Sequence, residues 1–487
     1  MRKASCRIFL CAFAATTLLL QESCVKNPVT GGRQLALISE SQEIAMGKES
    51  HPQVLAAFGA VEDQALQEYF SRIGLEIARI SHRPDLPWTF TIVDSPVVNA
   101  FAVPGGYVYL TRGILAYMNN EAELAGVVGH EIGHVAARHS VTQMSQQQLM
   151  GIGLVLGSVF SSRFRQMSSL AEMGLQVLLL KHSRDDERQS DQLGIQYMSK
   201  AGYDPTQMSR FFQVFTGLRE DDGAAIPNWL SSHPAPEDRI QAAAAAAEEV
   251  KRKSPGQQYK VNAGPLLARI DGAVYGENPR EGFVENNRFY HPDLRFQLDV
   301  PQGWKVQNTK SAVLFQEPGG NAVLQLTLVP PNAGQTPEAV GTTVARQEGI
   351  QFVEGGSLRI NGNPAYLGRY REQADTGIIE VLAAFVSYNK NIYQLAGLAP
   401  APAFSSFARN FDGTIRGFRE LTDARILSAQ PDRIRVYPAR EGESLRGIAK
   451  SQSQGKVTVE DLALLNRLNP DQALKAGAPV KLIRPGK

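Results

Sequence analysis

Apolar and polar positions follow more than one pattern along the 487 residues of the chain. Up to about residue 255 the apolar positions recur every three or four residues, which is the period of helices with one buried face. Two stretches depart from this period: residues 88–93 alternate as a strand, and residues 99–110 predict a hairpin that turns at Pro104-Gly105-Gly106. We therefore expect a mainly helical first domain with a small β-sheet, beginning with a helix over residues 41–81.

One helix of this domain, which begins after Asn120, carries the strongest chemical signal. Its apolar residues recur at helical spacing, so the helix is expected to be buried. His130 and His134 are one turn apart on it, and their imidazoles point to the same side at a separation that a tetrahedral zinc ion accepts. Glu131 projects beside them and could take a proton from a metal-bound water, as the general base of a metalloprotease does. The His-Glu-x-x-His pattern thus predicts a zinc-dependent hydrolase.

A third ligand is expected in the charged segment 182–194. Glu187 lies there one helical turn before Asp191, and core positions follow. A carboxylate at Glu187 would complete a His-His-Glu site and leave the fourth position for water. Asp191 would then be placed to accept the other ring N–H of a ligand histidine. The alternative interpretation of such a run is a solvated helix whose charges pair four residues apart.

Three elements together resemble the HtpX/Ste-type zinc metallopeptidase family, and most closely its BepA-like periplasmic branch. The first is the His-Glu-x-x-His helix. The second is Ser-Arg-x-x-Glu-x-x-Ser-Asp-x-x-Gly over residues 183–194, in which Ser190 stands where the family usually has Ala. The third is His-Pro-x-x-x-x-Arg over residues 233–239. The resemblance covers residues 25 to 250, and its three motifs together are specific.

The resemblance implies a gluzincin-type metallopeptidase domain over residues 25–255 that binds one zinc ion per chain. The family's pattern assigns roles to six residues of this sequence: His130, His134 and Glu187 as zinc ligands, Glu131 as base, Asp191 as support for the ligands, and Arg239 near the site. In the periplasmic branch the loop histidine, here His233, can occupy the open zinc position and hold the enzyme latent.

The predicted hairpin supplies a candidate substrate site. The main chain of an extended peptide could hydrogen-bond to the free edge of its first strand at almost any sequence. In the resembled family this segment is the substrate-binding edge, and here it consists of Asn99, Ala100, Phe101 and Ala102. An ordinary edge strand would show the same pattern, so both interpretations stand.

The amino terminus predicts a signal peptide over residues 1–24. A basic start is followed by an apolar run at residues 8–20, which has the length of a signal-peptide core and is short for a transmembrane helix. Cleavage before Cys24 would leave one cysteine at the mature terminus, as lipid attachment requires, while ordinary cleavage or an uncleaved anchor would fit the same run. Residues 27–35 resemble the mature start of lipoprotein members of the family, which favours a periplasmic protein anchored to the outer membrane through Cys24.

Two further apolar runs, residues 149–160 and 170–180, lie between the two metal-binding motifs. Glycines or polar residues interrupt them, and each is shorter than a membrane span. We therefore expect core or interfacial helices there.

The next part of the chain changes to strands that alternate apolar and polar positions, separated by Pro and Gly turns. Helical stretches intervene at residues 337–348 and 403–418. We expect a mixed α+β domain with an antiparallel sheet over residues 270–422. Its opening residues resemble those of PsbP-like α/β sandwiches. Its sequence contains no cluster of ligands and no pair of nucleophile and base, which favours a binding or spacing module.

The last segment, residues 430–487, predicts the order β-α-α-β and resembles a LysM domain. That family binds N-acetylglucosamine glycans such as peptidoglycan, although Glu443 stands where an Asp is usual. The alternative is a docked structural cap, because a fold alone does not establish a function.

Together these patterns predict an α+β multidomain protein: a helical metallopeptidase domain, a mixed α/β sandwich and a LysM-like domain. A net charge of +2 gives no reason to expect a nucleic-acid partner. The predicted function is a zinc endopeptidase that hydrolyses unfolded or misassembled envelope proteins and is held to the membrane by a lipid anchor. The competing interpretation is a latent or non-catalytic scaffold or chaperone that binds peptidoglycan.

Overall fold

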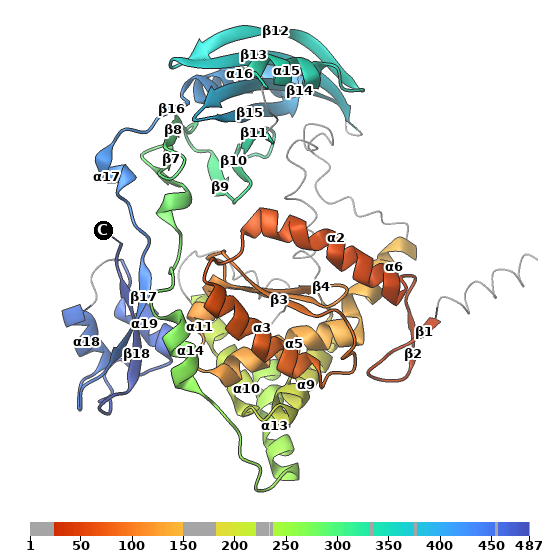
Figure 1. Ribbon diagram of the computed structural model, residues 1–487, viewed down its shortest axis with the longest axis vertical. Helices are drawn as coiled ribbons and strands as arrows, with labels where there is room; N and C mark the ends of the chain where they lie inside the picture. Colours follow the sequence, from red (N-terminus) through yellow and green to blue (C-terminus); the bar gives the residue numbers. More distant parts are fainter. Residues whose placement is uncertain are drawn as a thin grey trace, which may run out of the picture.

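The computed structural model describes residues 24–149, 182–220, 233, 237–330, 335–374, 377–452 and 456–486. The predicted signal peptide apart from Cys24, and residues 150–160 and 170–180 of the two apolar runs, lie outside these residues. Figure 1 shows three bodies: the first domain at the bottom in red to light green, the middle domain at the top, and the last domain in blue at the side. No helix within the described ranges has the length and apolar character needed to span a membrane.

The first domain consists of helices packed around a small sheet. Its helices are α2 (Glu40–Phe58), α3 (Gln64–Ala78), α4 (Arg112–Ala116), α5 (Glu121–Ala137), α6 (His139–Leu149), α9 (Arg184–Lys200), α10 (Thr206–Phe212), α11 (Val214–Glu220), α13 (Glu237–Lys253) and α14 (Ala263–Ile270). Its strands are β1 (Cys24–Lys26), β2 (Arg33–Leu35), β3 (Thr89–Val93), β4 (Ala100–Val103) and β5 (Tyr107–Thr111).

The single helix predicted over residues 41–81 is two helices, so that prediction is wrong. Helix α2 ends at Gly59, which takes a φ of 68°, a conformation that glycine adopts without strain. Asp63 then caps α3 by accepting a hydrogen bond from the N–H of Leu66.

The sheet of the first domain has the strand order β3-β5-β4. The hairpin formed by β4 and β5 is antiparallel, as predicted, with Ala100 opposite Leu110. Gly105 and Gly106 make its turn, at φ values of 87° and 95°. Strand β3 runs parallel to β5. In the described part of the chain β4 is therefore an edge strand of this sheet.

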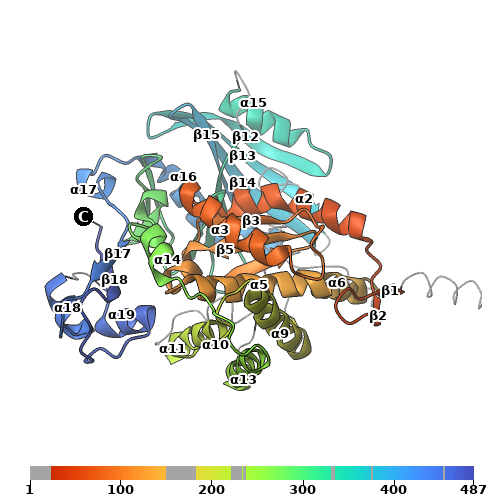
Figure 2. The ribbon, with the colours of Figure 1, turned by 60° about the horizontal axis from the view of Figure 1, so that its bottom comes forward.

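Helix α5 lies in the middle of the largest hydrophobic core, and all of its residues are buried. Figure 2 shows it between the sheet with α2 and α3 on one side and α9, α10 and α13 on the other. Helix α14 adds Leu266, Leu267 and Ile270 to the same core. The core thus continues past the predicted domain boundary at residue 255.

The middle domain is a mixed α+β structure. Its elements are η1 (Pro279–Glu281), β6 (Phe283–Glu285), β7 (Arg288–His291), β8 (Phe296–Asp299), β9 (Lys305–Asn308), β10 (Ala312–Gln316), β11 (Val323–Leu328), α15 (Pro337–Ala345), β12 (Ile350–Ile360), β13 (Asn363–Ala374), β14 (Gly377–Tyr388), β15 (Asn391–Pro400), α16 (Ala401–Arg416), β16 (Arg419–Glu420) and α17 (Ala424–Leu427).

Seven of these strands form one antiparallel sheet in the order β12-β13-β14-β15-β11-β10-β9, and four form a second sheet, β16-β8-β7-β6. Successive residues of β14 belong to different cores, since Ala383 and Phe385 pack under α15 while Ala384 and Val386 pack under α16. The large sheet is therefore covered on both faces at β14, and this strand is accordingly buried at most successive positions instead of alternating.

The last domain has the predicted β-α-α-β order: β17 (Arg433–Pro438), α18 (Leu445–Gln452), α19 (Val459–Asn466) and β18 (Pro479–Arg484). The two strands pair antiparallel over their full length. Both helices contribute to a small core of their own, through Leu445, Ile448, Leu462 and Leu465.

This last domain is docked on the corner between α4 and α5. Nζ of Lys481, which is 1% exposed, donates to the carbonyl oxygens of Ala116 at 2.5 Å and Met118 at 3.0 Å, where α4 ends. The guanidinium of Arg467 pairs with the carboxylate of Glu123, which lies in the first turn of α5. Two basic side chains from the last domain thus hold the segment that leads into the buried helix.

We predict that Arg467→Ala loosens this docking. Glu123 is 2% exposed in its side chain, so loss of its partner leaves a buried carboxylate at a cost on the order of 3 kcal/mol. Arg446→Ala is the matched control, because Arg446 pairs with Asp471 at the surface, where such pairs contribute little to stability. Hydrogen exchange in β18 and at the start of α5 is expected to accelerate in Arg467→Ala alone. Equal exchange in both variants would contradict the docking.

Candidate metal centre

The histidines of α5 are positioned by a capped helix. Asn120 accepts a hydrogen bond from the backbone N–H of Glu123 and so caps the first turn. His130 and His134 lie further along the helix, and their ring centroids are 4.7 Å apart. The two Nε2 atoms are 3.0 Å apart, and both residues are buried. The predicted pair therefore faces one common point.

Helix α9 brings two carboxylates to the same point because it crosses α5 at very short distance. A Cβ on Gly194 would lie 2.9 Å from the backbone nitrogen of His130, and a Cβ on Gly129 would lie 3.0 Å from the carbonyl oxygen of Gly194. Glycine is needed at both positions for this approach. As a result Glu187 is 0% and Asp191 5% exposed, which excludes the solvated charged helix as the interpretation of this segment.

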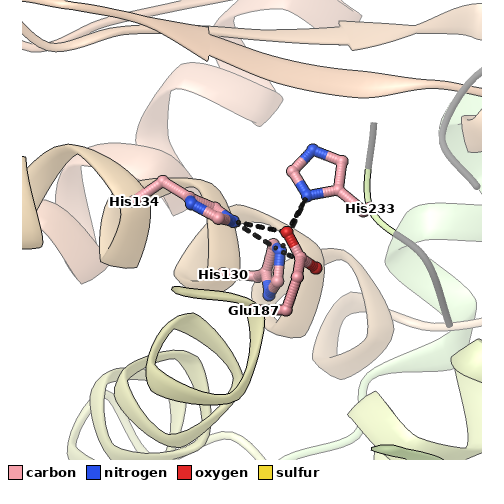
Figure 3. Close-up of side chains that lie close together, drawn as sticks. All are labelled: His130, His134, Glu187 and His233. Carbon is pink, nitrogen blue, oxygen red and sulfur yellow. Dashed lines mark hydrogen bonds and ion pairs between the residues drawn. The ribbon is translucent and has the colours of Figure 1, made fainter. Parts of the chain in front are cut away.

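Four side chains offer one donor atom each, and these atoms all lie within 4.8 Å of one another: His130, His134, Glu187 and His233. Figure 3 shows the four side chains pointing toward one another. Glu187 Oε1 is 3.4 Å from His134 Nε2 and 2.8 Å from His233 Nδ1, and His130 Nε2 is 3.3 Å from His233 Nδ1. A tetrahedral zinc ion, with bonds of about 2.0–2.1 Å, separates its ligand atoms by about 3.4 Å.

The protonation of His130 is set by Asp191. Nδ1 of His130 lies 2.9 Å from Oδ1 of Asp191. Burial opposes ionisation of Asp191, but hydrogen bonds from His130 and Arg239 hold its pKa below the usual value. An ionised carboxylate only accepts, so Nδ1 of His130 carries the proton and Nε2 presents a lone pair to the common point. This is the orientation that metal ligation requires.

His134 obtains the same tautomer from a pair of residues that the sequence analysis did not identify. Its Nδ1 is 2.9 Å from Nδ1 of His139, whose Nε2 is 2.8 Å from Oε1 of Gln189. The amide oxygen only accepts, so His139 donates through Nε2 and accepts from the Nδ1–H of His134. Burial, with the nearby His182, holds the pKa of His134 well below the usual value, so this ring is neutral.

His182 also joins the histidine cluster without a predicted role. Its ring centroid lies 4.0 Å from that of His134 and 5.3 Å from that of His233. Burial lowers the pKa of His182 to about 3. No ligand motif in the sequence marks His182, His139 or Gln189, and only their proximity in the fold reveals them.

Arg239 links the two carboxylates of α9. Its Nε and Nη2 are each 2.8 Å from an oxygen of Asp191, and its Nη1 is 2.6 Å from Oε2 of Glu187. Burial alone would raise the pKa of Glu187. The charge of His233 and its hydrogen bond to Glu187 instead hold it well below the usual value, so Glu187 is ionised. Arg239 thus lies beside the site, where the resemblance places it.

These residues fit a zinc ion. Two imidazole lone pairs face each other at 3.0 Å beside an ionised carboxylate, and a zinc ion would accept all three donors at one point. Neutral histidine and carboxylate are zinc ligands. Glu131 follows His130 on α5, is 1% exposed, and has Oε1 3.8 Å from Nε2 of His233. The chemistry of the donors therefore supports the predicted cofactor, one zinc ion per chain.

The remaining predicted site residues lie elsewhere in the first domain. Asn99 directly precedes β4, and Ala100, Phe101 and Ala102 lie within it. Cys24 begins β1, which pairs with β2 and contributes no donor atom to the metal group.

Comparison with known proteins identifies two parts of the chain. Residues 64–247 match Peptidase family M48, and residues 437–482 match the LysM domain. The first match contains every residue of the metal centre. The resemblance of the first domain to zinc metallopeptidases and of the last to LysM domains is thereby confirmed.

The curated relatives carry protease names. The chain is 31% identical over 236 residues to the beta-barrel assembly-enhancing protease of Yersinia pestis, covering 46% of this chain and 48% of that one. It is 28% identical over 233 residues to the protein of the same name from Escherichia coli K12, covering 46% and 47%. It is 29% identical over 221 residues to the mitochondrial metalloendopeptidase OMA1 of Schizosaccharomyces pombe, covering 44% and 64%. The chain thus spans about half the length of the first two relatives.

Among solved structures, cyanobacterial PsbP (CyanoP) from Synechocystis sp. PCC 6803 matches 27% of this chain and 91% of its own. The identity is 16% and the TM-score 0.24. A likeness of this strength does not establish a shared fold, so the PsbP-like sandwich stays a prediction.

We predict that Gly194→Ala weakens zinc binding at least about tenfold, since changes that displace ligand supports cost 10–100-fold in metal affinity. The added Cβ would lie 2.9 Å from the backbone nitrogen of His130 and push α9 away from α5. Gly413→Ala in α16 is the matched control, because its Cβ would meet nothing within 4 Å. Competition with a zinc chelator measures the zinc affinity of both variants. Unchanged affinity in Gly194→Ala would show that the close crossing does not hold the site.

Proposed function

We propose that this protein is a zinc metalloendopeptidase of the bacterial cell envelope that hydrolyses peptide bonds in unfolded or misassembled proteins. The observation that carries the proposal is that Glu131 lies on the same buried helix as His130 and His134, beside the group of donor atoms. A zinc site that only stabilises a fold has no use for such a base. The match to Peptidase family M48 and the protease names of the relatives support the same function.

Different side chains would have different roles in hydrolysis. Zinc held by His130, His134 and Glu187 would supply Lewis acidity and lower the pKa of water in the site. Glu131 would take the proton of the attacking water and later return it to the leaving amine. Asp191, with His139 and Gln189, would keep the two imidazoles in the tautomer that ligation needs.

Strand β4 offers main-chain groups to a substrate. The N–H of Thr111 donates to the carbonyl oxygen of Asn99 at 3.0 Å, so these residues form a hydrogen-bonded pair of the hairpin. Such pairs alternate along antiparallel strands, and the groups of Ala100 and Ala102 therefore point away from β5 toward the edge. An extended polypeptide could pair with them whatever its sequence. This supports a preference for unfolded chains, whose main chain is accessible.

His233 supports a latent state. Its Nδ1 lies among the donor atoms, and the residue is 2% exposed. In that position it would act as the fourth ligand and exclude a substrate carbonyl. We infer that His233 has to leave before catalysis begins.

The other domains and the amino terminus would determine where the protein lies in the cell envelope. The LysM match supports peptidoglycan binding through residues 430–487. Export and lipid attachment at Cys24 would place the protease in the periplasm at the outer membrane, close to polypeptides that fail to assemble.

One alternative is favoured by the closed ligand set: if His233 never leaves, the protein would be a peptidoglycan-binding scaffold or chaperone with a structural zinc site.

We expect Glu131→Gln to abolish proteolysis without loss of zinc. Loss of a positioned general base lowers the rate on the order of 100-fold or more. Cleavage of an unfolded protein such as casein by the zinc-loaded mature chain is compared with that by the variant, and zinc content is measured in both. Equal cleavage by the two proteins would rule out Glu131 as the base.

We expect His233→Ala to raise proteolysis severalfold and to leave the zinc content unchanged, because His130, His134 and Glu187 remain as ligands. His51→Ala, a substitution on α2 outside the metal centre, is the control. If the activity does not rise, His233 is not a latch. If neither protein cleaves the substrate, the scaffold interpretation gains support.

A further inference from the structure

A cavity of about 350 Å³ lies where the first domain meets the middle domain. Its walls come from the end of α2, from the segment between β3 and β4, from the start of β4 and from β9 with the residues that follow it. The volume lies in the range of small-ligand sites. Two of the four residues of the proposed substrate edge, Asn99 and Phe101, line it.

Much of the lining is apolar, and one polar group in it lacks a partner. Phe58 and Phe101 lie side by side with ring centroids 6.0 Å apart, and Val97 and Val306 also face the cavity. Asn99 is 3% exposed, and none of the described residues hydrogen-bonds to its Oδ1. A buried polar group left without a partner is unfavourable. The cavity thus combines an apolar wall with an acceptor that an N–H group would satisfy.

The charged residues around the cavity satisfy one another. Asp94 pairs with Arg112 at 2.5 Å and with Lys310 of the middle domain at 2.7 Å. Lys310 also contacts Glu281 at 2.5 Å. Burial raises the pKa of Glu277, the remaining carboxyl in the lining, and so favours its neutral form. This balance gives no preference for an ionic ligand, and the apolar wall formed by Phe58, Val97, Phe101 and Val306 would receive an apolar group.

The cavity lies beside the start of β4. A polypeptide paired with Ala100 and Ala102 would have its next residues beside Asn99, about 3.3 Å further for each residue. Side chains of an extended chain alternate between its two sides, so one of them would face the cavity. The N–H groups of the same chain are the donors that Asn99 Oδ1 lacks.

We propose that this cavity is a substrate subsite that takes one large apolar side chain of an extended polypeptide, while a main-chain N–H of that polypeptide donates to Asn99 Oδ1. The proposal rests on the proposed proteolytic function, whose substrate edge it extends. One wall of the subsite is β9, so the middle domain takes part in choosing the substrate. Unfolded and misassembled proteins expose the large apolar side chains that folded proteins bury.

Peptide binding to the zinc-loaded Glu131→Gln chain tests the subsite without cleavage. Fluorescent peptides built of Gly, Ser and Asn carry a single Phe at successive positions, and anisotropy measures their affinity relative to the peptide without Phe. Burial of the side chain should strengthen binding at least about tenfold at one position. Gln307→Trp, which fills the cavity from β9, should reduce this ratio to within about twofold.

Gln351→Trp is the matched control, because Gln351 is an exposed glutamine on β12, the opposite edge strand of the same sheet. It should leave the ratio unchanged. The subsite is refuted if Phe gives no gain at any position, or if Gln307→Trp and Gln351→Trp give the same ratio. Hydrolysis by the His233→Ala chain is measured separately. Failure of that chain to cleave would refute the proposed function, while the binding ratio still tests the subsite.

Discussion

The structure depends on the convergence of two imidazole lone pairs and one carboxylate at a buried point, an arrangement that a zinc ion would stabilise. Helices α5 and α9 can form it because Gly129 and Gly194 let their backbones approach closely. Asp191 and the pair His139 and Gln189 then fix one tautomer on each ligand histidine. A helix that carries such a site has to be rigid, and α5 is buried along its whole length.

The two added domains contact the metal-binding domain at the elements that matter for its function. The last domain holds the corner from which α5 starts, through Arg467 and Lys481. The middle domain meets the start of β4, where Lys310 pairs with Asp94 across the boundary. The proposed glycan-binding domain and the domain that lines the proposed subsite would therefore both be fixed against the first domain.

The sequence was informative where the chemistry is local. His130, Glu131 and His134 share one helix, and Glu187 and Asp191 share another, so spacing alone predicts which side chains point together. The supporting residues depend on long-range packing and carry no motif: His139 meets Gln189 fifty positions away, and Lys481 finds its partners across a domain boundary. The break of α2 at Gly59 was missed because an isolated glycine is also tolerated inside a helix. The role of Cys24 and the PsbP-like relation stay predictions.

X-ray absorption at the zinc edge of the purified chain tests the central claim most directly. The account predicts one zinc ion with three nitrogen ligands, from His130, His134 and His233, and one oxygen ligand from Glu187, at about 2.0–2.1 Å. In His233→Ala one nitrogen should be replaced by oxygen from water, with zinc retained. A first shell that contains sulfur, a shell that His233→Ala leaves unchanged, or a chain that binds no zinc would contradict the account.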